Sequence, residues 1–231
     1  MCALRPPIAS RRILCHDLSV YGAYRLHQRE SMLPAKQLEA VIVALHDIGA
    51  VRFGDFKLHS GRHSPIYLDL RLLPSYPAVL RRVAAVYVAI LETLPFDLLA
   101  AMPLAGLPIG TAVSLQMDRP LLYPRQALKG YGTGKQVEGT WSPGQRVVAI
   151  DDLITSGDSL LQGIAVLEEA GLLVSGAVVL VDRQQGGRQT LLERGYTLHS
   201  AFTLDQMLAT LEQAGRISPR QHTQVSQALK L

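Results

Sequence analysis

The sequence predicts an α/β fold in which helices cover both faces of a central, mostly parallel sheet. Continuous apolar runs, such as residues 147–150 and 177–181, alternate along the chain with amphipathic helical patterns. No internal repeat, low-complexity segment or linker divides the chain from residue 36 onward. With 231 residues, 48% of them hydrophobic and 18% charged, the chain can bury one sizeable core.

The first elements of the expected domain are a helix, a β-hairpin and a second helix. Apolar residues recur at helical spacing over residues 38–48, and a glycine follows as a stop. Alternating apolar residues over 53–58, a Ser-Gly turn and an extended segment over 65–70 predict the hairpin. The apolar spacing over residues 76–94 predicts the second helix.

The remainder of the chain alternates strand and helix patterns, as a parallel sheet requires. A glycine-rich loop is expected over residues 125–139. Strands are expected over residues 97–103, 119–124, 146–151, 173–182 and 196–202. Helices are expected over residues 105–116 and 159–171, over a short segment before 196, and over 203–215 and 218–230.

Composition narrows the class of protein and its surroundings. The net charge of +4 does not by itself imply an electrostatic grip on nucleic acid. No apolar run approaches the roughly 18 residues that a membrane-spanning helix needs, so no membrane association is expected. Cys2 and Cys15 lie in the first fifteen residues without a partner in the body of the chain. A disulfide framework is therefore not expected, and a reducing cytoplasm fits best.

Residues 1–31 are interpreted as a disordered extension or a misassigned start. The segment is basic but has no apolar stretch long enough for a signal peptide, and a transit peptide is the lesser alternative. Met32 opens a clean helical pattern, so the folded domain is expected to span residues 32–231.

The run VVAIDDLITSGDS, residues 147–159, carries the chemistry. Asp151 and Asp152 are expected to emerge at the carboxyl end of a buried strand, where ligands of parallel sheets bind. Two adjacent carboxylates at such a point can accept hydrogen bonds from neighbouring sugar hydroxyls or hold hydrated Mg²⁺.

The turn after these acids predicts an anion site. Gly157 permits a tight turn, and the hydroxyls of Thr155, Ser156 and Ser159 join the N–H groups of the following helix. The alternative is that Asp158 or Ser159 only caps the helix while the acids face solvent. A Walker loop is excluded, because no Gly-Lys-Ser/Thr follows the strand, and a dinucleotide fingerprint is absent.

These residues resemble the phosphoribosyl pyrophosphate (PRPP) signature of the type I phosphoribosyltransferases. The resemblance implies the fold of that family, with a hood formed by residues 32–75 and the C-terminal segment. It also implies that Asp151 and Asp152 contact the ribose 2′ and 3′ hydroxyls while the turn holds the 5′-phosphate. The implied PRPP contacts in this run are Asp151, Asp152, Leu153, Ile154, Thr155, Ser156, Gly157, Asp158 and Ser159.

Three other segments resemble the orotate phosphoribosyltransferases, above all the form fused to a decarboxylase in UMP synthase. They are FGDFKLHSGRHSPIYLDLR (53–71), YPRQALKGYGTGKQVEG (123–139) and LVDRQQGG (180–187). The resemblance implies Mg²⁺-dependent transfer of phosphoribose from PRPP to orotate, which yields orotidine 5′-monophosphate and pyrophosphate. It also implies a homodimer whose loop 125–139 covers the site of the other subunit. The subsequent decarboxylation is expected to come from another protein.

The resemblance assigns roles to particular residues. Lys129 is implied as the catalytic lysine of the loop, acting with Asp151 and Asp152. Mg²⁺ is expected to be held mainly through PRPP, with Asp152 as the candidate protein ligand. The further implied PRPP contacts are His59, Arg125, Gln126 and Tyr131, and the implied orotate contacts are Tyr67, Leu68, Thr155 and Arg183.

The chemistry of these residues supports the assignments and leaves alternatives open. A cationic, glycine-rich loop closing over departing pyrophosphate would offset negative charge and exclude water; alternatively, it is a solvated basic loop. Arg183 can meet an acidic or carbonyl-bearing base in a forked geometry, or form an ion pair with Asp182 or a neighbouring acid. Tyr67 can face the pyrimidine or serve as a core aromatic.

Three positions depart from the family pattern. His59 replaces a lysine of the hairpin turn, Gln126 replaces a lysine of the loop, and Leu104 with Ala105 replaces a Tyr-Lys or Tyr-Thr pair. These changes are expected to weaken PRPP binding or to shift charge compensation to Mg²⁺. Two other functions therefore stay open: a PRPP-binding regulator without turnover, and an enzyme with a purine acceptor. The sequence shows no DNA-binding helix of the kind expected in a regulator, and the orotate-like hairpin argues against a purine acceptor.

Overall fold

The computed structural model describes residues 35–57, 61, 63–125 and 136–231. All of these lie in one compact unit, Ser31–Leu231. The predicted extension, residues 1–31, lies outside the described residues.

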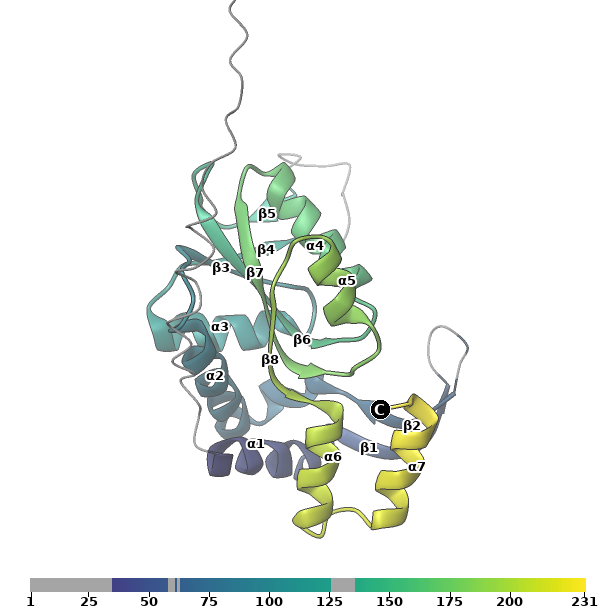
Figure 1. Cartoon of the computed structure of the whole chain (residues 1–231). Coiled ribbons are helices and arrows are strands. Elements are labelled where there is room, and N and C mark those ends of the chain that lie inside the picture. Colours follow the sequence, from purple (N-terminus) through teal and green to yellow (C-terminus); the bar gives the residue numbers. More distant parts are fainter. Residues whose placement is uncertain (1–34, 58–60, 62, 126–135) are drawn as a thin grey trace, which may run out of the picture. The chain divides into compact units, whose positions relative to one another are not determined.

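A six-stranded sheet forms the centre of this unit, in the order β5-β4-β3-β6-β7-β8 (Figure 1). Neighbouring strands run parallel, except that β5 is antiparallel to β4. The mostly parallel sheet expected from the sequence is thus confirmed. The strands are β3 (Leu98–Ala101), β4 (Leu121–Pro124), β5 (Val137–Glu138), β6 (Arg146–Ile154), β7 (Leu173–Asp182) and β8 (Leu198–Thr203).

Helices cover both faces of the sheet, which explains the continuous apolar runs of its central strands. Side chains alternate between the two faces of a strand. Val148 and Ile150 of β6 therefore pack with helices α2 (Pro77–Leu91) and α3 (Gly106–Met117). Val147 and Ala149 pack with α4 (Asp158–Glu169) and α5 (Gly187–Glu193) on the other face.

A two-stranded antiparallel hairpin stands apart from the main sheet. It consists of β1 (Val51–Lys57) and β2 (His63–Leu68), and its buried residues share a core cluster with α1 (Ala35–Asp47), α6 (Leu204–Gln213) and α7 (Pro219–Leu229). Figure 1 shows α1 beside α6, and β2 of the hairpin lies next to α7. Residues from the N- and C-terminal parts of the unit thus build this subregion together.

Four local features differ from the sequence expectation. Strand β6 continues to Ile154, so the acid pair lies within the strand instead of after it, because β7 pairs with β6 as far as Asp182. Helix α4 begins at Asp158. A 3-10 helix (Leu70–Ser75) follows the hairpin, and the short β5 pairs with β4 inside a segment expected to be a loop. Among the described residues, no helix is long and apolar enough to cross a membrane.

Candidate active site

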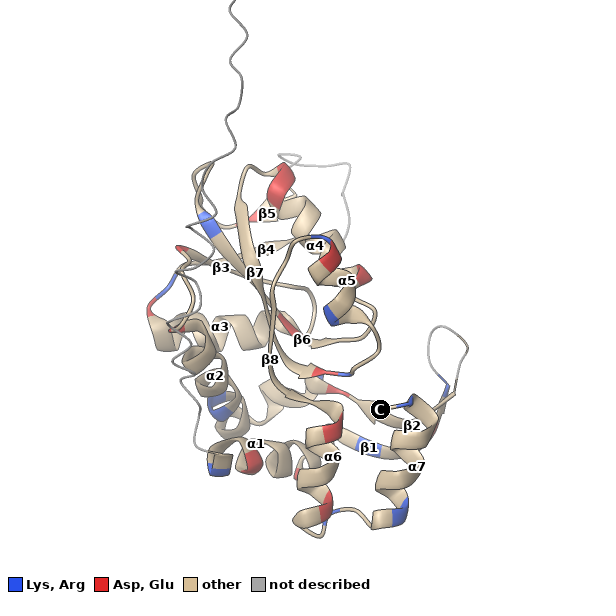
Figure 2. Ribbon diagram, in the orientation of Figure 1, with Lys and Arg blue, Asp and Glu red and all other residues tan. Residues whose placement is uncertain are grey.

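A cleft of about 340 Å³ lies where β6 passes into α4. The nine residues predicted to contact PRPP from this run all line it, so the structure brings the central part of the predicted site together. Figure 2 shows acidic residues on β6 near the middle of the sheet. The remaining lining residues are Arg71, Pro103, Leu104, Ala105 and Leu160.

Asp151 and Asp152 are half-buried and are fixed by short contacts from other elements. The hydroxyl of Tyr87, a fully buried residue of α2, donates to the Asp151 carbonyl over 2.7 Å. The Asp152 N–H donates to Asp151 Oδ1 over 2.9 Å. Gly106 at the start of α3 lies so close that an added Cβ would approach the Ile150 carbonyl oxygen to 2.9 Å and Asp151 Oδ1 to 3.4 Å. The backbone around the pair therefore has little room to shift.

Burial sets the charge of the acid pair. It raises the pKa of Asp151 well above its usual range, and the neighbouring Asp152 raises it further. Burial also raises the pKa of Asp152, and a side-chain hydrogen bond with Asp151, backbone hydrogen bonds and, least of these, the charge of Arg71 partly oppose this effect. An approaching cation, or a hydroxyl that donates to these oxygens, would relieve this unfavourable charging, so the pair is suited to bind one or both.

The turn after the acids leaves a helix start open to an anion. Gly157 adopts φ +91° and acts as the N-cap of α4, and no side chain in the described part of the chain caps this helix by a hydrogen bond. Capping by Asp158 or Ser159 is therefore wrong; instead Asp158 accepts a hydrogen bond from the Ser156 hydroxyl over 2.6 Å. The first N–H groups of the twelve-residue helix α4 remain available for a phosphate.

The segment after β7 supports this turn. Ile154 and Asp182 are register partners at the ends of β6 and β7, and the Arg183 N–H donates to the Ile154 carbonyl over 3.1 Å. The Gly187 N–H donates to the Thr155 carbonyl over 2.8 Å. The predicted base-binding positions Thr155 and Arg183 therefore follow paired residues on neighbouring strands.

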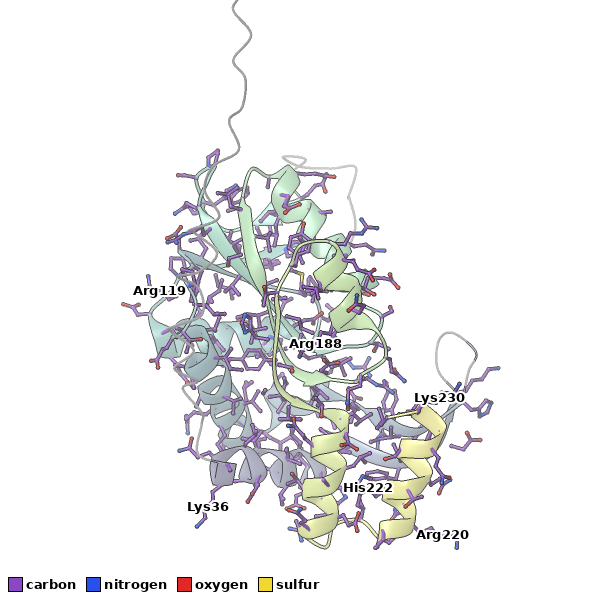
Figure 3. All side chains as sticks on the ribbon, in the orientation of Figure 1. Lys36, Arg119, Arg188, Arg220, His222 and Lys230 are labelled. Atoms are coloured by element: carbon purple, nitrogen blue, oxygen red, sulfur yellow. The ribbon has the colours of Figure 1, made fainter. Side chains whose placement is uncertain are left out.

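Arg183 is buried without a counter-ion among the described residues. Its side chain belongs to a residue only 7% exposed, and its Nε and Nη2 atoms have no hydrogen-bond partner there. Asp182 does not form the ion pair that was the alternative, because it pairs with Nε of Arg188 at 3.0 Å (Arg188 is labelled in Figure 3). Burial lowers the pKa of Arg183. An unpaired buried guanidinium is costly, and a bound anion or carbonyl would satisfy it.

Tyr67 and Leu68 of the hairpin point to opposite faces of β2. Leu68 is buried in the core, so a ligand can meet only its backbone. Tyr67 is half-buried; its ring centroid lies 5.5 Å from that of Phe56, and its hydroxyl accepts a hydrogen bond from Arg71 Nη2 over 2.8 Å. Tyr67 is thus connected to the cleft through Arg71.

Some predicted residues are not part of this arrangement. Arg125 does not line the cleft; it forms an ion pair with Glu138 of β5. His59, Gln126, Lys129 and Tyr131 lie outside the described residues.

Sequence reasoning did not single out four residues that shape the site. Arg71 lines the cleft, Tyr87 holds the Asp151 carbonyl, and Gly106 and Gly187 allow close approach of α3 and α5. Arg71 directly follows the predicted extended segment, residues 65–70, and this position is the one local signal for it, because a charged residue there departs from the apolar pattern. Tyr87 had no such signal, since it occupies an ordinary apolar position of a helix.

The donor set fits a magnesium ion held together with substrate phosphates. Among the described residues, no group of three or more His, Cys, Asp or Glu side chains could hold a metal alone. Two adjacent carboxylates are nevertheless present in the cleft. Mg²⁺ usually takes one or two carboxylates, substrate phosphate oxygens and water as ligands, so this set is sufficient once a phosphorylated substrate is bound.

Comparison with known proteins agrees with the phosphate-binding character of this cleft. The model of the phosphoribosyl transferase domain family matches residues 75–191. The orotate phosphoribosyltransferase of Pyrobaculum aerophilum is 38% identical over 172 residues, which cover 74% of this chain and 89% of that protein. Uridine 5′-monophosphate synthase of Bos taurus is 40% identical over 183 residues, which cover 78% of this chain and 38% of the bovine protein.

A solved structure with the same arrangement is that of Leishmania donovani UMP synthase. It has a TM-score of 0.77 and 40% sequence identity, and the match covers 83% of this chain and 42% of that one. The chain thus spans about two-fifths of the length of these longer relatives. This likeness confirms the fold class expected from the sequence.

Proposed function

The chain belongs to the phosphoribosyltransferase family and, within it, to the orotate phosphoribosyltransferases, and from this premise we propose that it transfers phosphoribose from PRPP to orotate. The products are orotidine 5′-monophosphate and pyrophosphate, a step of UMP biosynthesis. One observation carries the proposal: a carboxylate pair and the start of α4 share one cleft, and a buried arginine with no counter-ion among the described residues follows the neighbouring strand β7.

PRPP fits this cleft in one orientation. The 5′-phosphate binds the turn Thr155–Ser159 and the first N–H groups of α4. The ribose hydroxyls then donate to Asp151 and Asp152 on the adjoining strand. The pyrophosphate at C1 extends toward the side of the cleft formed by Arg71 and Pro103–Ala105.

Orotate is placed by the neighbouring strand and the hairpin. Arg183 supplies a buried guanidinium that can pair with the orotate carboxylate or a ring carbonyl. Tyr67 and the backbone of Leu68 contact the ring, and Thr155 lies at its edge. The orotate N1 atom attacks C1 as pyrophosphate leaves. Because N1 is already acidic, no strong general base is needed.

Charge on the leaving pyrophosphate must be offset as the bond to C1 breaks. Bound Mg²⁺ would supply positive charge there, held by Asp152 and by the phosphates of PRPP. The family resemblance adds Lys129, Arg125 and Tyr131, together with His59 and Gln126, as pyrophosphate or PRPP contacts. We propose these roles together with a homodimer in which loop 125–139 acts on the partner's site.

An assay of both substrates tests this function. Purified full-length protein is incubated with Mg²⁺, PRPP and orotate, and the loss of orotate absorbance is followed; steady turnover is the expected result. Retained PRPP binding without turnover at saturating PRPP would contradict the enzyme and favour the regulator. Turnover with adenine or hypoxanthine in place of orotate would instead identify a purine acceptor.

A further inference from the structure

Arg71 contributes a positive charge to the lining of the cleft. It is the one Lys or Arg among the described residues that line the cleft, whereas Asp151, Asp152 and Asp158 contribute three carboxylates. Its side chain remains 58% exposed. If a substrate carries two separate phosphate groups, Arg71 is the described lining residue whose positive charge can bind the group that lies away from the helix start.

Two hydrogen bonds orient the guanidinium of Arg71, and they do not use all of its N–H donors. Its Nε donates to Asp69 Oδ1 over 2.7 Å, and its Nη2 donates to the Tyr67 hydroxyl over 2.8 Å. The side chain of Asp69 is only 15% exposed, and its hydrogen bond fixes one edge of the guanidinium. These two bonds use two of the five N–H donors that a guanidinium carries. The others have no hydrogen bond to a described residue and can form a fork for an anion.

The segments that line the cleft differ in the way they can bind phosphate. The turn at residues 156–159 offers helix N–H groups, which suit the single 5′-phosphate. The segment at residues 103–105 contributes Pro103, Leu104 and Ala105, none of which has a charged side chain. Only Arg71 can neutralise a second phosphate there among the described lining residues.

We propose that Arg71 binds the pyrophosphate group of PRPP and, through its bond to Tyr67, connects the pyrophosphate site to the acceptor site. This inference rests on the proposed function for the identity of the ligand. The hydrogen bond from Nη2 to the Tyr67 hydroxyl keeps the aromatic ring beside the guanidinium. A pyrophosphate that binds the remaining donors fixes Arg71, and with it Tyr67, before orotate enters.

Leu104 and Ala105 of this chain carry no charge, and Arg71 lies in the same cleft. An arginine from the segment after the hairpin thus provides charge that the loop Pro103–Ala105 does not.

The test compares Arg71→Gln with the unmodified protein in two measurements. Calorimetric titration with Mg²⁺ and inorganic pyrophosphate measures the site directly, and initial rates over both substrates give KM and kcat. Arg71→Gln should weaken pyrophosphate binding and raise the KM for PRPP by about ten- to hundredfold, because a forked charge-assisted contact is lost. The kcat should change less, and Arg71→Lys should restore part of the affinity.

A matched control removes an arginine–aspartate pair elsewhere. Arg216→Gln breaks the exposed contact of Arg216 with Asp47 and should leave both measurements unchanged. Asp69→Asn loosens Arg71 but keeps its charge, so it should weaken pyrophosphate binding less than Arg71→Gln does. Equal losses in the two variants would mean that Arg71 only shapes the hairpin, which would overturn the proposal.

The outcomes separate this proposal from the proposed function. Unchanged pyrophosphate affinity and KM in Arg71→Gln, with normal orotate turnover by the unmodified protein, would overturn the role of Arg71 alone. Pyrophosphate binding that depends on Arg71, without any turnover of orotate, would support the site and contradict the enzyme. If circular dichroism shows that Arg71→Gln is unfolded, Arg71→Lys carries the test, and wild-type affinity in that variant would refute a forked contact.

Discussion

The hydroxyl of Tyr87 donates a hydrogen bond to the backbone carbonyl of Asp151 over 2.7 Å, which ties α2 to the strand that carries the acid pair. Tyr87 is fully buried, and burial together with the nearby Asp152 and Asp151 raises its pKa well above the usual range. The hydroxyl therefore stays protonated and remains a donor at any physiological pH. We interpret it as a positioning residue for the acids.

Replacement of Tyr87 by phenylalanine tests this role. The lost donor leaves the Asp151 carbonyl unpaired, so the free energy of unfolding should fall by about 1–2 kcal/mol. The backbone at Asp151 should also loosen, which raises the KM for PRPP by about five- to tenfold with a smaller change in kcat. Denaturant unfolding and steady-state kinetics measure the two effects.

Tyr196→Phe is the matched control for this variant. It removes a hydroxyl that bonds to Glu168 over 2.8 Å, away from the residues that line the cleft. We expect unchanged kinetics in this control. A Tyr87→Phe protein that loses stability but keeps the KM for PRPP would show that Tyr87 only fills the core.

Gly187 packs against the proposed phosphate-binding turn and donates its N–H to the Thr155 carbonyl. An alanine at position 187 should displace this turn. An added Cβ would lie 2.6 Å from the Thr155 carbonyl oxygen and 2.5 Å from Ile154 Cγ1. The isoleucine side chain can rotate, but the carbonyl belongs to the backbone of the turn. Gly187→Ala should therefore raise the KM for PRPP by about tenfold or more.

Gly110→Ala separates this effect from a general loss of stability. Its Cβ would come within 2.6 Å of the Ala101 Cβ, a clash between α3 and β3. Both variants should melt at lower temperature, and only Gly187→Ala should bind PRPP more weakly in calorimetry. Equal PRPP affinity in the two proteins would exclude a specific role of Gly187 in the turn.

Lys129 tests the part of the proposed mechanism that lies outside the described residues. If its charge offsets the leaving pyrophosphate, Lys129→Ala should lower kcat by about a hundredfold, the scale reported for loss of one electrostatic contact to a transition state. Circular dichroism should be unchanged. Lys36→Ala, on the exposed side of α1 (Figure 3), serves as a charge-matched control with normal turnover. A Lys129→Ala enzyme with normal kcat would remove this lysine from the mechanism.

The sheet and its helices followed from the sequence because their signals are long and local. The apolar runs of β6 and β7 are buried on both faces, and amphipathic patterns gave the positions of α2, α4 and α6. The 3-10 helix Leu70–Ser75 and the two-residue strand β5 were missed, because such short elements form through their neighbours and carry little sequence pattern.

The candidate site was predictable where one continuous motif supplies it. Residues 151–159 are contiguous, so their shared cleft follows from a strand–turn–helix unit. Arg71 lines this cleft from the 3-10 helix after the hairpin, and Tyr87 reaches the Asp151 carbonyl from α2. Both positions depend on how distant segments pack together. Arg183 was predicted, but its lack of a counter-ion was not, since Arg188 takes Asp182 in a contact that depends on how α5 packs.

The acid pair connects function to stability through its charge. Burial, and then the proximity of Asp152, raises the pKa of Asp151 in the folded protein above that in the unfolded chain. The fold therefore favours the protonated form. Its stabilising contribution is fully present below the unfolded pKa and is lost as pH rises through the folded pKa. At a pH well above the unfolded pKa, the buried acid pair should therefore destabilise the free protein, and Mg²⁺ with PRPP should relieve this.

Asp151→Asn should consequently make the protein more stable and less active. Asparagine mimics the protonated side chain, so at pH 7 the Tm should rise by about 2–4 °C, the shift that 1 kcal/mol produces in a domain of this size. Turnover should be largely lost, because the ribose contact and charge are removed. Asp97→Asn should have the opposite effect on stability, since Arg146 lowers the pKa of Asp97 by hydrogen bonding and its contribution is present above the unfolded pKa. Thermal melts at pH 4 and pH 7 measure the change in Tm for each variant. A fall in Tm for Asp151→Asn at pH 7 would contradict the interpretation that charge on the buried acid pair is unfavourable.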